Sequence, residues 1–212
     1  MIKNVIFDIG NVLVRWDPLT VVAQFFPPPA DCQALTRRLF RSEEWFALNL
    51  GKITELELLQ LYHQQLGIDL ALLQALMQAV KESLLPIPGS FAILDNLYQA
   101  GIPLYALTDS TKEIVKYLQG KYQFWKKFKG IVVSAEIGYM KPSAFIYQYL
   151  LDTYQLKAAE TLFIDDYLPN IEGAKQLSLQ TIQFENASQC SADLRRIDFV
   201  EQAVKPVGNH KS

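Results

Sequence analysis

Short, nearly continuous apolar runs recur along the chain and are separated by segments of helical periodicity. Runs of this length without polar alternation are typical of parallel strands that are buried on both faces of a sheet. We expect strands at residues 2–7, 102–108, 130–134, 161–164 and 180–184. Between them, helices are expected at residues 90–101, 143–154 and 169–177. This alternation predicts an α/β fold with a doubly wound parallel sheet.

One long interval breaks the alternation, because no strand pattern appears between about residue 18 and residue 84. Four helices are predicted there instead, near residues 30–40, 43–50, 54–66 and 69–84. Thr54 and Glu57 have the spacing of a capping box, and Asp69 is a predicted N-cap. An insertion directly after the first strand would lie over the carboxyl ends of the strands, where such sheets bind ligands. We therefore predict an α/β core (1–17 and 85–200), a helical cap (18–84) and a tail (201–212).

The composition narrows the classes of function. The chain has 212 residues and a formal net charge of -2, and 50% of its residues are hydrophobic. This charge balance argues against nucleic acid as a partner, so we interpret the lysine-rich aromatic stretch at 121–130 as a helix face. No apolar run reaches the length of a membrane span, and the first residues lack the pattern of a signal peptide. With only Cys32 and Cys190 as thiols, we expect a cytoplasmic location. The expected oligomeric state is a monomer or a homodimer.

Polar side chains stand at or just beyond the ends of the predicted strands. In chain order they are Asp8, Thr108, Asp109, Lys141, Asp165 and Asp166. Because the carboxyl ends of parallel strands meet at one edge of a sheet, we expect these groups to converge. Converging carboxylates raise each other's pKa unless a cation compensates them, and Mg²⁺ takes carboxylate and phosphate oxygens as ligands. The set predicts a magnesium site at which Asp8 attacks a phosphoryl group held by Lys141 and Thr108.

Four stretches resemble the motifs of the haloacid dehalogenase-like (HAD) hydrolases, whose members are mostly phosphatases. They are "VIFDIGNVLV", "PLYALTDS", "GYMKP" and "LFIDDYLPNIEGAKQL", and the resemblance runs through about residue 185. It implies a Rossmann-like core, and the helical insertion matches the C1-type cap of the family. The motifs are most similar to a subgroup of small bacterial sugar-phosphate phosphatases that includes α-glucose-1-phosphate phosphatase.

The resemblance also implies a role for each motif residue. Asp8 matches the nucleophile, and Thr108 and Lys141 match the groups that hold the phosphate. The implied ligands of Mg²⁺ are Asp8, the carbonyl of Gly10, Asp165 and Asp166, of which Asp166 is expected to bind most directly. The implied substrate-binding residues are Thr108, Asp109, Lys141 and Asn170. The expected partner is a small phosphorylated metabolite, such as a sugar 1-phosphate.

Two positions depart from the family pattern. Most family phosphatases have an aspartate two residues after the nucleophile as general acid and base, and this chain has Gly10 there. Asp109 stands where asparagine is common. Asp17 and Asp109 are the substitute proton donors that we can name. Without a donor, the enzyme would need an easily expelled leaving group, which is the reason for expecting a sugar 1-phosphate and a steep dependence of rate on leaving-group pKa.

Two other functions remain open. A 2-haloacid dehalogenase uses the same aspartate to attack carbon without a metal, but such enzymes lack the acidic pair that Asp165 and Asp166 form here. A family member without catalysis could bind a partner through its cap, although the motif residues are all present. If the cap sets specificity, its candidate contacts are Glu43, Glu44, Trp45, Asn49, Lys52 and His63. We interpret most of these as cap core or as a solvated face.

Overall fold

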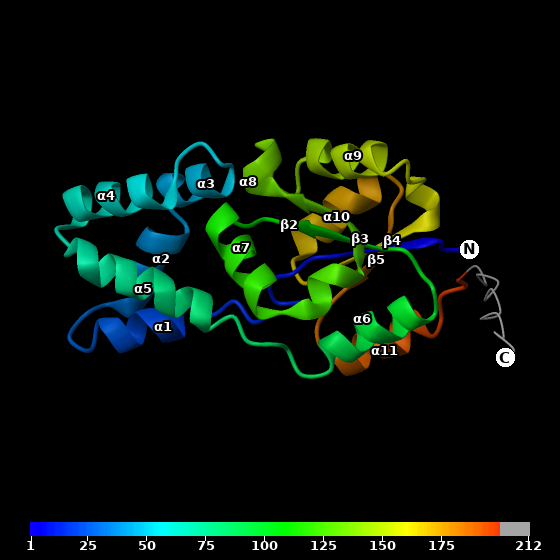
Figure 1. The fold of residues 1–212 in the computed structure, drawn as a ribbon, viewed down its shortest axis with the longest axis horizontal. Helices are drawn as coiled ribbons and strands as arrows, with labels where there is room; N and C mark the ends of the chain where they lie inside the picture. Colours follow the sequence, from blue (N-terminus) through cyan, green and yellow to red (C-terminus); the bar gives the residue numbers. More distant parts are fainter. Residues whose placement is uncertain (200–212) are drawn as a thin grey trace, which may run out of the picture.

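The computed structural model describes residues 1–199 and contains one sheet of five parallel strands (Figure 1). β1 (Asn4–Phe7) lies at the centre of the strand order β3-β2-β1-β4-β5. The other strands are β2 (Leu104–Thr108), β3 (Phe128–Val133), β4 (Thr161–Asp165) and β5 (Gln180–Gln183). Because every pairing is parallel, all five carboxyl ends lie at the same edge. The predicted α/β fold with a parallel sheet is confirmed.

Helices cover both faces of the sheet, as a doubly wound fold requires (Figure 1). One face carries Val5 and Phe7 and packs against α6 (Ser90–Gln99), α7 (Lys112–Lys121) and α11 (Ala187–Leu194). The other face carries Ile6 and packs against α9 (Ala144–Thr153) and α10 (Leu168–Gln176). Because successive side chains of a strand point to opposite faces, the apolar residues of β1 contribute to two separate hydrophobic cores.

The insertion after β1 consists of five helices, which we call the cap. They are α1 (Pro18–Phe25), α2 (Cys32–Phe40), α3 (Glu43–Asn49), α4 (Glu55–Leu66) and α5 (Leu70–Glu82). Figure 1 shows the cap beyond the carboxyl ends of the strands, at the opposite end of the molecule from the N-terminus. The capping box of Thr54 and Glu57 and the N-cap at Asp69 are confirmed. The apolar core of the cap is continuous with the core under α6 and α7.

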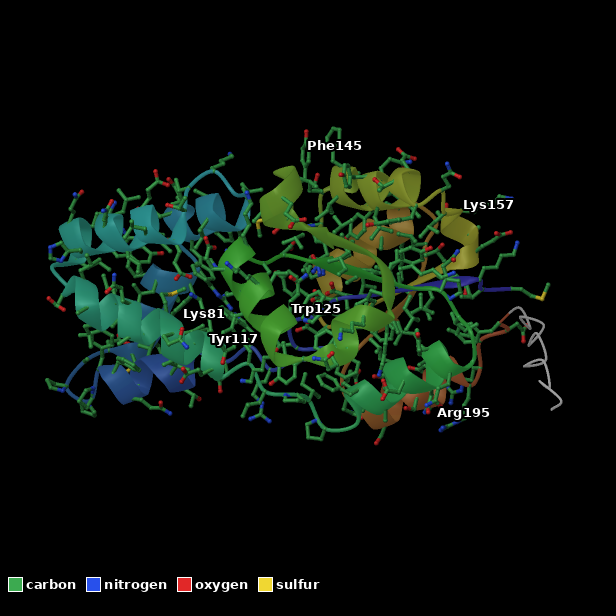
Figure 2. The ribbon with its side chains drawn as sticks, in the orientation of Figure 1. Lys81, Tyr117, Trp125, Phe145, Lys157 and Arg195 are labelled. Atoms are coloured by element: carbon green, nitrogen blue, oxygen red, sulfur yellow. The ribbon has the colours of Figure 1, made fainter. Side chains whose placement is uncertain are left out.

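Sequence reasoning missed α1 and misassigned one stretch. The signal for α1 was present, because Asp17 caps the helix and Pro18 stands in its first turn. The stretch at 121–130 is not a helix face. α7 ends at Lys121, a 3₁₀ helix η1 (Gln123–Lys127) follows, and β3 begins at Phe128. The aromatic side chains of η1 are buried in the core, which explains why aromatic residues alternate with lysines in this stretch. Figure 2 shows Trp125 inside the molecule.

Three further short elements were not predicted, namely α8 (Ser134–Ile137), η2 (Ala158–Glu160) and α11. Within residues 1–199, no helix has both the length and the apolar character needed to cross a membrane. The predicted tail at 201–212 lies outside the described residues. The division into core and cap at residues 17, 18, 84 and 85 remains a prediction.

Candidate active site

The carboxyl ends of three strands deliver polar side chains to one place. Asp8 follows β1, Thr108 ends β2 and Asp165 ends β4. Pairing of β1 with its two neighbours sets these residues side by side at the sheet edge. A cavity of about 220 Å³ lies between this edge and α3 of the cap. The predicted site residues that line it are Asp8, Gly10, Thr108, Asp109, Lys141, Asp166 and Asn170.

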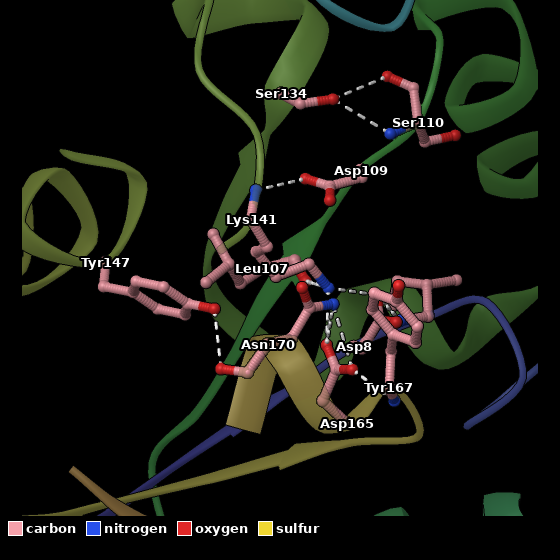
Figure 3. Close-up of polar contacts among 11 residues, drawn as sticks. Asp8, Leu107, Asp109, Ser110, Ser134, Lys141, Tyr147, Asp165, Tyr167 and Asn170 are labelled. Carbon is pink, nitrogen blue, oxygen red and sulfur yellow. Dashed lines mark hydrogen bonds and ion pairs between the residues drawn. The ribbon is translucent and has the colours of Figure 1, made fainter. Parts of the chain in front are cut away.

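Lys141 is buried at the centre of the site and is not a solvated loop residue. Its Nζ lies 2.9 Å from Asp8 Oδ1 and 2.7 Å from Asp165 Oδ2, and it donates to the Leu107 carbonyl at 3.2 Å (Figure 3). Burial by itself would lower the pKa of Lys141, but the neighbouring carboxylates outweigh it and hold the pKa above the usual value. The side chain is therefore a fixed cation beside Asp8.

Asp165 is fully buried, and both of its oxygens are engaged. Oδ1 accepts from the Tyr167 amide at 2.8 Å and from Asn170 Nδ2 at 3.1 Å. Oδ2 accepts from Lys141 Nζ at 2.7 Å and from Asn170 Nδ2 at 3.1 Å. These contacts use most of the lone pairs of the carboxylate. Asp165 therefore positions Lys141 and Asn170. The structural contact of Asn170 is with Asp165, and its contact with substrate stays a prediction.

Asp8, Asp165 and Asp166 form an acidic cluster, in which one ligand atom from each lies within 4.8 Å of the others. Burial raises the pKa of Asp8 well above its usual value, and the charges of Asp165 and Asp166 raise it further, while Lys141 opposes them. The pKa of the half-buried Asp166 is raised by burial and by Asp165. Within residues 1–199, the ammonium group of Lys141 thus faces three carboxylates, and the cluster carries excess negative charge.

One oxygen of Asp8 is held and the other is not. Oδ1 accepts from its neighbouring Ile9 amide at 2.7 Å and from Lys141. For Oδ2, no hydrogen bond is found among residues 1–199.

Gly10 lies two residues after Asp8, and a Cβ added to it would meet no atom within 4 Å. The fold therefore leaves room for a side chain at the position where most family phosphatases have their second aspartate.

Of the two predicted substitute proton donors, only Asp109 lies in the cavity. Its Oδ1 accepts from the Lys141 amide at 3.1 Å, and burial raises its pKa to about 6 against the opposing charge of Lys141 (Figure 3). Asp17 is engaged elsewhere as the cap of α1. Its carboxylate accepts from the Thr20 amide at 3.2 Å and from the Thr20 hydroxyl at 2.7 Å. Asp17 is not among the residues that line the cavity, so the structure does not support it as the proton donor.

Most of the predicted cap contacts are also absent from the cavity. Trp45 and Asn49, both on α3, line it. Glu44 instead pairs with Arg38 at 3.0 Å, and His63 Nδ1 lies 2.7 Å from the carbonyl of Ile68. The remaining two candidates, Glu43 and Lys52, are exposed side chains outside the cavity. The cap therefore presents one large apolar ring and one amide to the site.

Ser134 joins the core to the cap beside the site, and sequence reasoning missed it. Its hydroxyl accepts from the Ser110 amide at 3.0 Å and donates to the carbonyl of Asn49 at 2.7 Å. Nearby, Gly51 has φ of 66°, and a Cβ there would lie 2.0 Å from the Ala135 carbonyl oxygen. Only glycine permits this approach of cap and core. A serine following a strand gives no sequence signal for such a link.

The turn between β1 and α1 holds two further residues that the sequence did not single out. Asn11 has φ of 52°, in the left-handed region that asparagine tolerates. Its Oδ1 accepts from the Trp16 amide at 2.9 Å, which fixes the course of the turn. Asn11 and Trp16 both line the cavity. "GN" directly after Ile9 is a turn signal that would have located this feature.

Comparison with known proteins places the chain among hydrolases. It is 28% identical over 201 residues to the sesquiterpene phosphatase of Aspergillus oryzae, covering 92% of this chain and 96% of the relative. It is 25% identical over 206 residues to the D-ribitol-5-phosphate phosphatase of Bacteroides thetaiotaomicron, covering 92% and 97%. A crystal structure of a HAD family enzyme from the same bacterium, in complex with magnesium and inorganic phosphate, superimposes with a TM-score of 0.72.

That structural match has 19% sequence identity and covers 88% of this chain and 96% of the other, so it bears on the fold alone. The sequence of residues 2–177 matches a family as a whole. This stretch includes β1, the cap, Lys141 and the acidic pair. The chain belongs to the haloacid dehalogenase-like hydrolases.

Proposed function

We propose that the protein is a magnesium-dependent phosphatase that hydrolyses a small organic phosphomonoester through an aspartyl-phosphate on Asp8. The observation that carries this proposal is the buried ammonium of Lys141, 2.9 Å from Asp8 and 2.7 Å from Asp165, beside the acidic cluster. A cation that binds the transferring group stands next to a carboxylate that can attack it. This arrangement supports the attack of Asp8 on a dianionic phosphate ester.

The residues present fit Mg²⁺. The cluster offers hard oxygen ligands and carries excess negative charge. Burial, and after it the neighbouring carboxylates, raise the pKa of Asp8 and Asp166. Asp8, Asp166 and the carbonyl of Gly10 would hold the ion, while Asp165 is engaged with Lys141 and Asn170. When bound, Mg²⁺ supplies positive charge that neutralises the carboxylates and stabilises the charge of the transferring phosphoryl group.

The chain's own residues account for the remaining chemistry. The Ile9 amide and Lys141 hold Asp8 Oδ1, so Oδ2 is the oxygen that we assign to the attack on phosphorus. The bond from phosphorus to the alcohol oxygen breaks as the new bond to Asp8 forms. Thr108 and Lys141 bind oxygens of the phosphoryl group. Water then attacks the phosphorus of the aspartyl-phosphate, releasing inorganic phosphate and restoring Asp8.

Asp109 is the residue to which we assign the proton transfers. It lines the cavity, and its pKa of about 6 suits a group that donates a proton and later accepts one near neutral pH. Asp109 would protonate the departing alcohol oxygen and then take a proton from the attacking water. The two departures from the family pattern would thereby compensate, because a carboxylate is missing at Gly10 and present at Asp109.

The relatives support phosphate-ester hydrolysis but differ in the alcohol. Both are named as phosphatases, one for a sesquiterpene and one for D-ribitol 5-phosphate. These alcohols have opposite polarity, so the comparison supports no single substrate class. The sugar 1-phosphate remains a sequence-based prediction. The acidic pair beside Lys141 disfavours the 2-haloacid dehalogenase, and the convergence of the motif residues disfavours a partner-binding protein without catalysis.

A screen of phosphate esters tests this function. Purified protein would be incubated with p-nitrophenyl phosphate and a set of metabolite phosphates, with Mg²⁺ or with chelator, and inorganic phosphate would be measured. A parallel assay would measure halide released from 2-chloropropionate. We expect phosphate release that requires Mg²⁺ and no halide release. Halide release that persists in chelator, without turnover of any phosphate ester, would overturn the proposal.

A further inference from the structure

We propose that the cavity selects monophosphates of apolar alcohols, with the hydrocarbon group seated against a wall formed by the β1–α1 turn, α3, α7 and the segment between α5 and α6. This inference rests on the proposed phosphatase function and names its substrate class. It replaces the sugar phosphate that the sequence predicts. The wall consists of Val14, Trp16, Trp45, Leu84, Ile114 and Leu118, all of which line the cavity.

The wall is apolar and is built from four parts of the chain, one of which is Leu84 in the segment between α5 and α6. Val14 and Trp16 come from the turn after β1, Trp45 comes from α3, and Ile114 and Leu118 lie one turn apart on α7. Apart from Trp16, these side chains are buried and belong to the continuous core that joins sheet and cap. Hydrocarbon placed against them would extend this core, and each buried methylene would strengthen binding by about fourfold.

Trp16 and Trp45 form the aromatic part of the wall. Their ring centroids are 5.9 Å apart with an angle of 21° between the planes, so the rings are stacked. Phe40 packs edge-on against both, at 5.0 Å from Trp45 and 5.8 Å from Trp16. This packing fixes the rings before any ligand binds, while Trp16 stays partly exposed. A preformed apolar surface costs little ordering on binding.

The three asparagine side chains of the cavity are poorly placed to bind a sugar, because each has a polar atom engaged within the protein. Asn11 Oδ1 accepts from the Trp16 amide, and Asn49 Nδ2 donates to the Trp45 carbonyl at 2.8 Å. Asn170 Nδ2 is directed at Asp165. The charged groups lie at the phosphate end. A polyhydroxylated chain along the wall would lose hydrogen bonds to water without replacing them, which is unfavourable in a buried site.

The size of the cavity limits the hydrocarbon group. An apolar cavity of roughly 150 Å³ accepts a molecule of the size of benzene. The 220 Å³ available here must hold the phosphate group as well. The cavity therefore suits a short or branched hydrocarbon group of about the bulk of five carbons, and longer chains would have to extend out of the cavity.

The first test compares two esters of primary alcohols, whose leaving groups are similarly basic, and uses p-nitrophenyl phosphate, an ester of a much more acidic phenol, as a general phosphatase substrate. With Mg²⁺ present, kcat/KM would be measured for 3-methylbutyl phosphate, for D-ribitol 5-phosphate and for p-nitrophenyl phosphate. We expect kcat/KM to be at least tenfold higher for 3-methylbutyl phosphate than for D-ribitol 5-phosphate. An equal or reversed ratio would overturn the inference but leave the phosphatase function intact. Lack of turnover of all three esters would contradict the phosphatase function itself.

Variants then assign the preference to the wall. Trp16→Gln should lower the ratio at least fivefold, and Trp16→Phe should largely retain it. Phe46→Gln is the matched control, because Phe46 lies on α3 next to Trp45 but is 45% exposed and does not line the cavity. A ratio that is the same in wild type and in folded Trp16→Gln would show that the wall does not select the substrate.

A binding measurement on the unaltered protein needs neither a folded variant nor turnover. Methyl to hexyl phosphonates would be titrated calorimetrically in the presence of Mg²⁺. We expect the dissociation constant to fall by about fourfold per methylene until the cavity is filled, near five carbons. A dissociation constant that is independent of chain length would overturn the inference, whatever the outcome of the kinetic assays.

Discussion

The floor of the cavity, at the sheet edge, is charged and held by directed hydrogen bonds, whereas its wall below the cap is apolar and held by ring packing. At the floor, Lys141 is placed by three oxygen atoms, and Asp165 by three donor groups. At the wall, Trp16 and Trp45 are placed by stacking on each other and by edge-on packing of Phe40 against both. The two regions therefore have different tasks. The directed contacts of the floor fix the reacting atoms, and the packed wall selects the shape and polarity of the substrate.

The strongest test of the floor removes the nucleophile. Asp8→Asn keeps the size of the side chain but abolishes its attack, so turnover should fall by more than roughly 10³-fold, as is typical for loss of a nucleophile. The measurement is phosphate release from p-nitrophenyl phosphate, with mass spectrometry to exclude deamidation back to aspartate. Asp17→Asn is the matched control, because Asp17 caps α1 outside the cavity and asparagine caps equally well. Wild-type turnover in Asp8→Asn would remove Asp8 from the mechanism.

Removal of the metal should have the next largest effect. Chelation should abolish phosphate release, and added Mg²⁺ should restore it, because the cluster of Asp8, Asp165 and Asp166 carries uncompensated charge. Asp166→Asn should weaken Mg²⁺ binding, measured by calorimetry, by at least tenfold. Asp193→Asn, on α11 far from the sheet edge, is the control. Full activity in chelator would contradict the assignment of the cluster as a metal site.

Loss of the proposed proton donor, Asp109, should lower the rate less than loss of the nucleophile. Asp109→Asn should lower the rate about 10²-fold for alkyl phosphates and much less for p-nitrophenyl phosphate, whose leaving group needs no proton. The rate should then depend steeply on leaving-group pKa, whereas the wild type should show a shallow dependence. The measurement is single-turnover phosphorylation across aryl and alkyl esters of graded leaving-group pKa.

A second substitution sharpens that test. The added side chain in Gly10→Asp has room, because a Cβ there would meet no atom within 4 Å. In the Asp109→Asn background, Gly10→Asp should restore part of the rate on alkyl esters. A steep dependence in the wild type that Asp109→Asn leaves unchanged would show that Asp109 is not the donor, and would return to the sequence-based view that no donor exists.

The smallest expected effect concerns the link between the two regions. Ser134→Ala removes the hydrogen bonds to the Ser110 amide and the Asn49 carbonyl. We expect the free energy of unfolding to fall by about 1 kcal/mol and KM to rise severalfold, since Asn49 and Trp45 lie on the same short helix. Ser191→Ala is the control, because no side-chain hydrogen bond of Ser191 is found within residues 1–199. Equal thermal melting and equal KM in both variants would contradict this role of Ser134.

The floor could be predicted from the sequence because most of its residues end a strand or directly follow one. Parallel strands end at one edge, so Asp8, Thr108 and Asp165 converge once the strands are recognised. The local signals of Thr54, Asp69 and Pro169 also held, because caps and first-turn prolines depend on near neighbours in the chain.

The wall could not be predicted in the same way. Trp16 and Trp45 are 29 positions apart, and Ile114 is further still, so no periodicity joins them. Their contact depends on where five cap helices settle on the core, and hydrophobic packing leaves no directional signature in a sequence. Glu43 and Lys52 were predicted as cap contacts because they are charged, yet both side chains are exposed and lie outside the cavity. Ser134 was missed for a similar reason, because its partner Asn49 is 85 positions away.

The mixed origin of the wall bears on how this enzyme can be re-engineered. Val14 and Trp16 belong to the same short stretch of chain as the nucleophile Asp8, and Ile114 belongs to a helix of the core. A cap transplanted from a relative would bring a new Trp45 position but would leave most of the wall behind. A graft that transfers selectivity would therefore have to exchange residues 11–16, α3 and the wall positions of α7 together.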